Sequence, residues 1–478
     1  MSYEMVCGLE THVELATKTK IFCSCTTEFG GEPNTHCCPM CTGMPGTLPK
    51  LNRAVVEYAV TAGLATHCEI NPDAKMDRKN YVYPDLPKAY QISQYDQPLC
   101  RNGWVELSGG KKIRLTRIHI EEDAGKLVHE RGNTFIDYNR SGVPLIEIVS
   151  EPDIRSAAEA IEYLEKLQTI LRYIGVSDCK MQEGSLRCDV NISVRPVGSI
   201  GLGTRTEIKN MNSFSHITRA MEYETGRQID LLESGEAVAQ ETRRYDEKTG
   251  YTEGMRGKED ADDYRYFREP DLVAIRVDKA ALEEIRSRMP EDPQLRLARF
   301  KRDYGLPEDT ARRLAERRKI ADYFEAAAKG RKDPRAAANC ILGPIFARLS
   351  TDAEKDEFRI NVPPENLNAL LKLLDEGKIR SSQMKATLEK MLDTGKPASA
   401  FLSEKDLAGV SEDDLRKICE QAAAANPDAV RDYLGGKEKA LKAVLGAVMK
   451  ATRGRANPQE TEKILAEMLQ KGKPVELT

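Results

Sequence analysis

The chain changes its residue pattern about two-thirds of the way along its 478 residues. Of its 10 Phe, 17 Tyr and 1 Trp residues, only Phe346, Phe358, Phe401 and Tyr433 follow Phe324. Before this point, short segments alternate apolar and polar residues between Gly, Asn and Pro, a pattern typical of strands. From Pro290 onward the pattern is helical nearly throughout. The sequence therefore predicts an α+β region followed by an all-helical region.

Two long helices are expected within the first region. The first spans Ser156 to Ile174, with Ser156 as the N-cap, Gly175 as the stop and one apolar stripe made of Ile161, Leu164, Leu167, Leu171 and Ile174. The second runs from about Ser215 to Glu233. We expect both helices to cover one face of a sheet.

The helical region is expected to contain a second boundary near residue 400. Breaks in the helical pattern stand at Gly305 to Pro307, Asp333-Pro334, Val362 to Pro364 and Gly395 to Pro397. Beyond them, helix starts at Asn426-Pro427 and Asn457-Pro458 indicate a compact terminal bundle.

Composition excludes several classes of protein. Hydrophobic residues make up 40% and charged residues 31%, which argues against disorder, and the net charge of -4 excludes a uniformly basic nucleic-acid coat. The first residues carry acidic side chains and no apolar core of a signal peptide, and no uncharged apolar run approaches a membrane span. We therefore expect a cytoplasmic protein without membrane association, whose 12 cysteines are reduced.

Four cysteines have the spacing of a metal site. Cys23-Ser24-Cys25 and Cys38-Pro39-Met40-Cys41 form two close pairs twelve residues apart, which can place four thiolates around a tetrahedral zinc ion. Cys37 is an alternative to Cys38, and a set of reduced core thiols is the alternative to any metal. Four sulfur ligands close the coordination sphere, so a zinc ion at residues 23–41 is expected to hold a loop rather than to catalyse.

Carboxylates alternate with aliphatic residues on several predicted strands. Because successive strand side chains point to opposite faces, Glu10, His12 and Glu14 share one face of the segment from Gly8 to Leu15. The same alternation recurs in four other segments, at His119 with Glu121, at Glu147, at Asp189 with Asn191 and at Glu207 with Lys209. The polar side chains of these strands can therefore lie together on one face of a sheet, the polar floor.

Such a floor favours a divalent cation. Carboxylates crowded together raise one another's pKa and oppose folding unless cations neutralise them. Oxygen ligands with one imidazole suit Mg²⁺ or Mn²⁺, and Mg²⁺ commonly arrives with nucleotide phosphates. The alternative for any single residue is a solvated strand face.

Polar segments between the strands can line a substrate cavity. We expect loops at Asp77 to Tyr81, Lys88 to Gln91, Glu183 to Arg187 and Lys209 to Ser213, and Lys79 and Arg187 can face phosphates. Ordinary turn chemistry is the alternative. The sequence contains no Walker A element, so nucleotide binding cannot be inferred from that motif.

Two helical stretches carry local excesses of positive charge. Residues 295–319 contain nine Lys or Arg residues and four acidic ones, and residues 437–455 contain six and one. With few aromatic residues nearby to stack bases, these faces would contact the phosphates of a folded RNA. Solvated helix faces are the alternative.

Long ordered motifs resemble a known family over essentially the whole chain. They are Gly8 to Leu15, Asp77 to Tyr81, Pro87 to Gln94, Glu121 to Lys126, Pro144 to Asp153 and Asp262 to Phe267. Together they strongly resemble the B subunits of aspartyl/glutamyl-tRNA(Asn/Gln) amidotransferases. The resemblance implies a cradle-like mixed α/β catalytic domain over residues 1–292, an all-α helical domain over 293–403 and a small YqeY-like helical tail over 404–478.

The resemblance also implies an activity and its partners. Such enzymes are ATP-dependent carbon–nitrogen ligases that correct mischarged Glu-tRNA(Gln), Asp-tRNA(Asn) or both. ATP phosphorylates the side-chain carboxylate of the attached amino acid, and ammonia then forms the amide. We therefore expect a heterotrimer with the amidase, or A, subunit, which supplies ammonia, and with the small C subunit, and contacts with tRNA(Gln), tRNA(Asn) or both.

Site residues follow from the same resemblance. Catalytic and Mg²⁺-binding positions fall on Glu10, His12, Glu121, Glu147 and Glu207, with Asp189 as a catalytic neighbour and Glu122 as an alternative to Glu121. The ammonia entrance falls on Lys79 and Lys88. The ATP-binding positions, Lys79 and Arg187, are expected from the residues themselves, as cations that can face phosphates. The cysteine set occurs in only some family members, which favours structural zinc. The competing hypothesis is a noncatalytic zinc-containing scaffold that binds tRNA.

Overall fold

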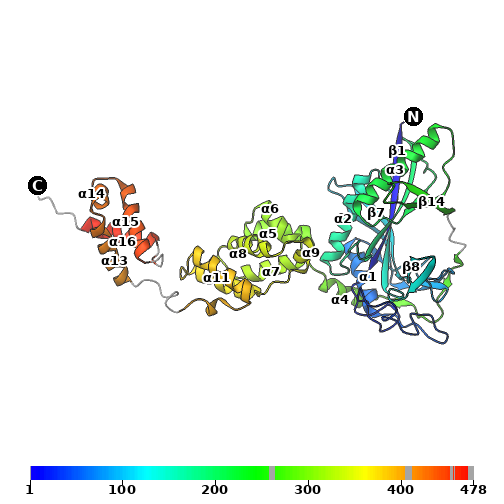
Figure 1. Cartoon of the computed structure of the whole chain (residues 1–478), viewed down its shortest axis with the longest axis horizontal. Helices are drawn as coiled ribbons and strands as arrows, with labels where there is room; N and C mark the ends of the chain where they lie inside the picture. Colours follow the sequence, from blue (N-terminus) through cyan, green and yellow to red (C-terminus); the bar gives the residue numbers. More distant parts are fainter. Residues whose placement is uncertain (1, 258–263, 404–411, 453–455, 457, 472–478) are drawn as a thin grey trace, which may run out of the picture. The chain divides into compact units, whose positions relative to one another are not determined.

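The computed structural model describes residues 2–257, 264–403, 412–452, 456 and 458–471 (Figure 1). It divides into two compact units, Met1–Pro290 and Glu291–Thr478. Several residues of the sequence features lie outside the described residues, namely Asp262, Asp263, residues 453–455 of the second basic stretch, and Asn457.

A nine-stranded mixed sheet organises the first unit. All neighbouring strands pair antiparallel except β12 and β13, which are parallel. Antiparallel sheets can keep one face on a core and leave the other polar. The order across the sheet is β14 (Thr252–Gly257), β13 (Glu241–Tyr245), β12 (Thr206–Lys209), β11 (Leu186–Pro196), β1 (Tyr3–Glu14), β10 (Pro144–Ser150), β7 (Lys112–Glu122), β6 (Cys100–Glu106) and β2 (Glu69–Ile70).

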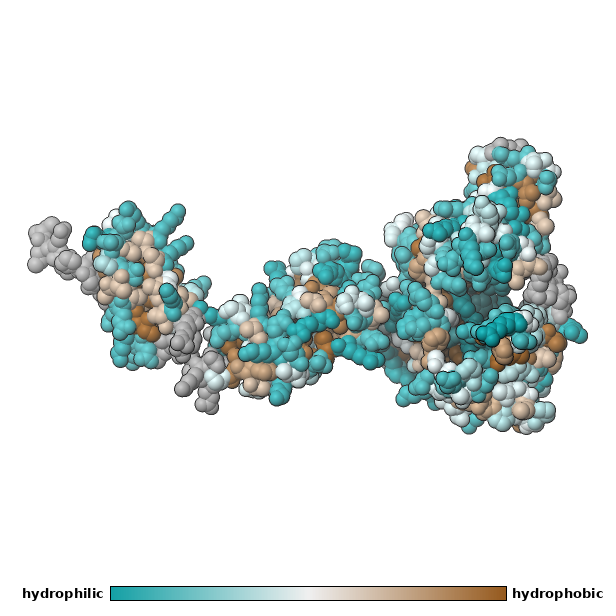
Figure 2. Space-filling view, viewed as in Figure 1, coloured by the Kyte–Doolittle hydropathy of each residue, from teal (hydrophilic) through white to brown (hydrophobic). Residues whose placement is uncertain are grey.

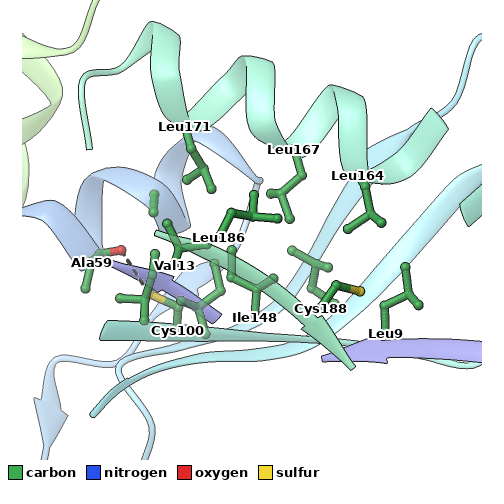
Figure 3. Packing of buried hydrophobic residues seen from close by; sticks show 14 of the residues in the cluster. Leu9, Val13, Ala59, Cys100, Ile148, Leu164, Leu167, Leu171, Leu186 and Cys188 are labelled. Carbon is green, nitrogen blue, oxygen red and sulfur yellow. Dashed lines mark hydrogen bonds between the residues drawn. The ribbon is translucent and has the colours of Figure 1, made fainter. Parts of the chain in front are cut away.

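One face of this sheet is covered by helices. Helix α2 (Ala157–Tyr173) begins at the Ser156 N-cap, whose hydroxyl accepts a hydrogen bond from the Glu159 amide, as the sequence predicted. Figure 3 shows its leucines pointing onto Leu9, Val13, Ile148, Leu186 and Cys188 of β1, β10 and β11. Among the described residues, the other α-helices of the unit are α1 (Arg53–Ala65), α3 (Phe214–Glu233) and α4 (Lys279–Arg288).

The orientation of β1 follows from this packing. Because Leu9 and Val13 are buried under α2, the alternation of the strand turns Glu10 and His12 to the opposite face of the sheet. The apolar residues of β10 and β11 fix the same orientation for their neighbours Glu147 and Asp189. The core thereby determines which side chains form the polar floor.

Two of the predicted loops are strands. Strand β4 (Asp77–Asn80) pairs with β5 (Tyr90–Ser93) and with β15 (Phe267–Arg268) in a three-stranded sheet. The loop assignments were therefore wrong for Asp77 to Asn80 and for Tyr90 and Gln91, because the pairing of β4 with β5, and with β15 about 190 residues away, outweighs the polar composition. Two short ribbons complete the unit: β3 (Asp73–Ala74) with β16 (Ile275–Arg276), and β8 (Lys126–Glu130) with β9 (Asn133–Asp137).

The second unit is helical throughout its described residues, and the predicted α+β region followed by an all-helical region is confirmed. Its buried apolar residues form two separate clusters, one from Phe300 to Ala398 and one from Leu415 to Leu469. Its α-helices are α5 (Pro293–Tyr304), α6 (Glu308–Ala315), α7 (Arg318–Ala328), α8 (Arg335–Cys340), α9 (Asp352–Glu357), α10 (Pro364–Asp375), α11 (Ser381–Thr394), α13 (Glu412–Ala425), α14 (Pro427–Leu434), α15 (Leu441–Ala451) and α16 (Pro458–Lys471).

The visible surface is mostly hydrophilic. Figure 2 shows hydrophilic colours over most of it, with small hydrophobic areas between them. Among the described residues, no helix combines the length and apolar sequence that crossing a bilayer requires.

Glu224 joins α3 to the end of the large sheet through a buried charge. Its carboxylate accepts hydrogen bonds from Arg227, Gln228 and, at 3.0 Å, the Thr252 hydroxyl of β14. Burial alone would raise the pKa of Glu224, but these hydrogen bonds and the charge of Arg227 hold it below its usual value. The folded state therefore stabilises the ionised carboxylate.

Acidification is expected to remove the stability that Glu224 provides. Because the folded-state pKa is depressed, this contribution is complete above the unfolded pKa of about 4.5 and is lost as pH falls through the folded pKa. Glu224→Gln should lower the free energy of unfolding by about 3 kcal/mol at pH 7 and by less at pH 4. Urea unfolding at several pH values checks this, with the exposed Glu222→Gln on the same helix as control. A deficit independent of pH would contradict the assignment.

Candidate functional site

The polar floor is built by five adjacent strands of the large sheet, β12, β11, β1, β10 and β7. His12 of β1 stands opposite Glu147 of β10, which stands opposite His119 of β7. Two residues along β1, Glu10 stands opposite Asp189 of β11. Same-face residues on one strand lie about 7 Å apart, so the two rows are neighbours. Sequence segments separated by more than 100 residues therefore contribute to one surface.

One group on this floor consists of His12, Glu121 and Glu147, the His12 cluster. One ligand atom from each lies within 4.8 Å of the others. His12 Nε2 is 3.6 Å from Glu121 Oε1 and 3.6 Å from Glu147 Oε2. His119, which is 2% exposed, adds its Nε2 at 3.3 Å from Glu147 Oε2. Together with His119, the His12 cluster thus presents two carboxylates and two imidazoles.

Lys79 and two imidazoles lie around the carboxylates of the His12 cluster. Burial alone would raise the pKa of Glu147, but His119, His12 and Lys79 hold it well below its usual value. Burial would likewise lower the pKa of Lys79, but Tyr266, Glu121 and Glu147 raise it, and its ammonium lies 4.9 Å from the Tyr264 ring centroid. Glu147 is therefore ionised, and Lys79 of β4 is directed to the predicted site.

A second group consists of Glu10, Asp189 and Glu207, the Glu10 cluster. One oxygen from each carboxylate lies within 4.8 Å of the others. The Asn191 amide donates to Glu10 Oε1 at 2.8 Å, and the Thr242 hydroxyl donates to Glu207 Oε2 at 2.8 Å. Donors on neighbouring strands therefore fix the orientation of two of these carboxylates.

Both clusters fit a divalent cation by the chemistry of their donors. Carboxylate oxygens with one or two imidazole nitrogens are suitable ligands for Mg²⁺ and Mn²⁺. A cation would also offset the repulsion among carboxylates that the sheet holds together. The polar floor brings Glu10, His12, Glu121, Glu147, Asp189 and Glu207 together in these two clusters.

The alternative residue Glu122 does not lie in the His12 cluster. Its carboxylate accepts from the Lys88 ammonium at 2.5 and 2.6 Å and from the Ile92 amide. Lys88 is thereby engaged away from the cluster, with 8% of its side chain exposed. Of the two neighbouring glutamates, Glu121 is the one that faces His12.

Arg187 of β11 is the cross-strand partner of His12 and lies on the same polar face of the sheet. It donates to Asp123 Oδ2 at 2.8 Å, while its Nε is buried without a hydrogen-bond partner among the described residues. Burial would lower the pKa of Arg187, but Asp123, Glu14 and Glu121 raise it. A permanent positive charge therefore borders the His12 cluster.

The four predicted cysteines converge in the stretch between β1 and α1. Cys41 Sγ lies 4.0 Å from Cys25 Sγ and 3.9 Å from Cys38 Sγ, and all four sulfurs lie within 4.8 Å of one another. Sulfurs around a tetrahedral zinc ion are about 3.8 Å apart, so the set fits zinc. The alternative Cys37 lies outside the set, with its Sγ 3.8 Å from Asn139 Oδ1.

The environment raises the pKa of Cys23 and Cys25 but lowers that of Cys41. A hydrogen bond from Cys23 lowers the pKa of Cys41 to about 4, assisted by the Cys38 amide and by Lys20 and opposed by burial. The fully buried Lys20 places its Nζ 3.6 Å from Cys41 Sγ. The Lys20 ammonium thus favours the thiolate form of Cys41, which is the form that binds a metal ion.

The charge count over residues 295–319 overestimates the positive surface of that stretch. Acidic residues outside this stretch neutralise part of its positive charge. Arg296 contacts Asp322 at 2.6 Å, and Arg317 contacts Asp356 at 2.6 Å. Arg299 is paired with Glu291 and Glu325, Lys301 with Glu308, Arg302 with Asp303, and Arg312 with Asp309. In the second stretch, Lys437 is paired with Asp432.

Comparison with known proteins gives the family. A family profile described as "GatB/GatE catalytic domain" matches residues 5–283, and one described as "GatB domain" matches residues 322–469. The chain belongs to the B-subunit family of aspartyl/glutamyl-tRNA(Asn/Gln) amidotransferases. Proteins named as the B subunit of this amidotransferase in Thermoanaerobacter pseudethanolicus, Caldicellulosiruptor saccharolyticus and Agathobacter rectalis are 56%, 55% and 52% identical to it. Each alignment covers 98% of this chain and 100% of the relative.

Two residues of the floor were not assigned from the sequence. The alternation of β7 places His119 on the polar face, but only the register shows that it lies against Glu147. The alternation of β12 places Lys209 on the same face as Glu207, but its contact with Asp189 of β11 depends on the pairing of β11 with β12. The alternation of side chains along a strand can place such residues on the polar face, whereas the order and register of the strands determine which residues they contact.

Proposed function

We propose that this chain is the B subunit of a tRNA-dependent amidotransferase and carries its ATP-dependent ligase site. The relatives that it matches over their whole length bear that name. The observation that carries the proposal is the polar floor, where two clusters of carboxylates meet Lys79 and Arg187. A noncatalytic zinc-bearing scaffold would not require such a concentration of buried charge, and this alternative is not favoured.

The proposed reaction has two steps. In the first, a side-chain carboxylate oxygen of the amino acid on Glu-tRNA(Gln) or Asp-tRNA(Asn) attacks the γ-phosphorus of ATP, giving an acyl phosphate and ADP. In the second, ammonia attacks the acyl carbon and inorganic phosphate leaves with the bonding electron pair, while a proton is released. Phosphorylation is required because an ionised carboxylate is a poor electrophile.

The side chains of the floor would position the phosphates. Glu10, His12, Glu121, Glu147, Asp189 and Glu207 would hold Mg²⁺ or Mn²⁺, which would offset charge on the phosphoryl group. Lys79 and Arg187 would face phosphate oxygens, because both are charged and border the His12 cluster. The ammonia entrance is proposed at Lys79 and Lys88.

The remaining expectations form part of the same proposal. The amidase (A) subunit, the small (C) subunit and tRNA would complete a cytoplasmic heterotrimeric assembly that serves protein biosynthesis, with structural zinc at Cys23, Cys25, Cys38 and Cys41. The domains would span 1–292, 293–403 and 404–478. The three separate hydrophobic clusters support this division.

Reconstitution tests the proposed function. The full chain, assembled with its amidase and small subunits, is incubated with Glu-tRNA(Gln), glutamine, ATP and Mg²⁺, and the amino acid on the tRNA is identified after deacylation. We expect conversion to glutamine with release of one phosphate per amide, and no conversion without ATP. If the partner subunits release ammonia and the tRNA binds while glutamate remains, the ligase assignment is wrong.

A further inference from the structure

A lysine of the sheet itself already occupies the Glu10 cluster. Lys209, at the end of β12, places its Nζ 2.8 Å from Asp189 Oδ2 and 3.3 Å from Glu207 Oε1. An ammonium at these distances offsets the negative charge of the carboxylates, as a metal ion would. The Glu10 cluster therefore contains a built-in positive charge seated on two of its three acidic residues.

A divalent ion in the Glu10 cluster has to compete with this ammonium. Magnesium binds oxygen at about 2.0–2.1 Å, so an ion on Asp189 and Glu207 would lie within a few ångströms of the ammonium that contacts both carboxylates. Two cations a few ångströms apart in a partly buried site repel each other strongly. Binding of the ion and retention of the lysine contact are therefore mutually opposed.

The side chain of Lys209 has the freedom to move. It is 41% exposed, whereas those of Asp189 and Glu207 are 16% and 9% exposed. Lysine carries its charge on a flexible stem of four carbons, while the carboxylates are short and Glu207 is also bound by Thr242. When the contact breaks, the lysine is thus the partner that leaves.

We propose that Lys209 is the resting cation of the Glu10 cluster and exchanges places with a divalent ion when a metal-bound nucleoside triphosphate arrives. The ion takes the carboxylates, and the released ammonium binds an oxygen of the incoming phosphates. Each charge gains a new partner in the exchange, so neither is left unpaired in the floor. This inference rests on the proposed function, because it requires the floor to receive the nucleotide.

The exchange predicts effects of opposite sign for one substitution. In the zinc-loaded full chain, Lys209→Met should bind Mn²⁺ alone at least 10-fold more tightly at the Glu10 cluster, or bind one more ion than the wild type. The same variant should bind the Mn²⁺ complex of the β,γ-methylene analogue of ATP at least 10-fold more weakly. Electron paramagnetic resonance of free Mn²⁺ and calorimetry measure the two affinities.

Matched variants isolate the role of the charge. Lys209→Arg keeps a cation and should follow the wild type more closely than Lys209→Met in both assays. Lys166→Met, which removes a lysine paired with Glu162 on α2, should match the wild type. Adding Asp189→Asn to Lys209→Met should abolish the gain in Mn²⁺ binding, because it removes a carboxylate of the cluster.

Each outcome decides the inference. Unchanged Mn²⁺ binding by Lys209→Met would show that the ammonium does not compete with the ion and would overturn it. Loss of both affinities together with a lower melting temperature would indicate a structural lysine and would also overturn it. If the wild type fails to bind the nucleotide complex, the proposed function fails, while the measurement with Mn²⁺ alone still decides whether Lys209 is the resting cation.

Discussion

Replacing Glu147 by glutamine is expected to lower ATP-dependent amide formation on the tRNA by about 100-fold or more. Both His12 and His119 approach the Glu147 carboxylate, at 3.6 and 3.3 Å, and Lys79 also lowers its pKa. The substitution preserves size but removes the negative charge that a cation and these imidazoles require. The loss should appear in phosphate release as well as in product, because activation precedes amidation.

Controls for the Glu147 variant separate chemistry from assembly. The release of ammonia from glutamine by the partner amidase should persist, since Glu147 lies in the floor of this chain. The exposed Glu165→Gln on α2 changes the same charge away from the floor and should retain wild-type activity. Amide formation by Glu147→Gln within a few-fold of the wild type would remove the His12 cluster from the mechanism.

Strand periodicity is sufficient to predict the main features of the floor. Glu10 and His12 alternate with Leu9 and Val13, and this alternation requires only that one face of β1 be buried. What periodicity cannot give is the order of strands, which places β11 on one side of β1 and β10 on the other. The division of the acidic residues into two clusters follows from that order.

The sequence also could not show whether Glu121 or Glu122 belongs to the His12 cluster, which only the folded structure determines. Both residues end β7 and both are buried, so neither composition nor burial distinguishes them. Lys88 and the Ile92 amide, which belong to the segment around β5, hold Glu122. The predicted loop at Lys88 to Gln91 did not reveal this contact, because residues 90–93 form a strand next to β4 and the contact of this segment with β7 depends on the fold.

Local charge counts were the least reliable guide. The window at residues 295–319 omitted Asp322, Glu325 and Asp356, although helix packing brings these acids against its arginines. Surface charge depends on pairs formed across elements, whereas a window counts only neighbours along the chain. The cysteine set was easier to predict, because its ligands are close in sequence and zinc coordination has one geometry.

Replacing Cys41 by alanine is expected to reduce the zinc content of the chain from about one ion to almost none and to unfold the segment that bears the site. No helix or strand lies between Glu14 and Arg53, a stretch that the structure describes in full. Phe29, Met44 and Leu48 are exposed there, so the segment has little core of its own. Structural zinc contributes about 10 kcal/mol or more to folding in such segments.

The neighbouring Cys37 provides the matched control for the Cys41 variant. Cys37→Ala removes a thiol from the same turn but outside the four-sulfur set, so zinc content and resistance to proteolysis within residues 15–52 should remain at wild-type levels. Elemental analysis and limited proteolysis measure the two quantities. Equal loss of zinc from both variants would show that Cys37 belongs to the ligand set. Zinc retained by Cys41→Ala would show that the ion does not depend on Cys41, and a wild-type chain without zinc would show that the sulfurs are core thiols. Since the buried Lys20 ammonium lies 3.6 Å from Cys41 Sγ, removal of this sulfur should also leave the ammonium without that partner and add to the local unfolding.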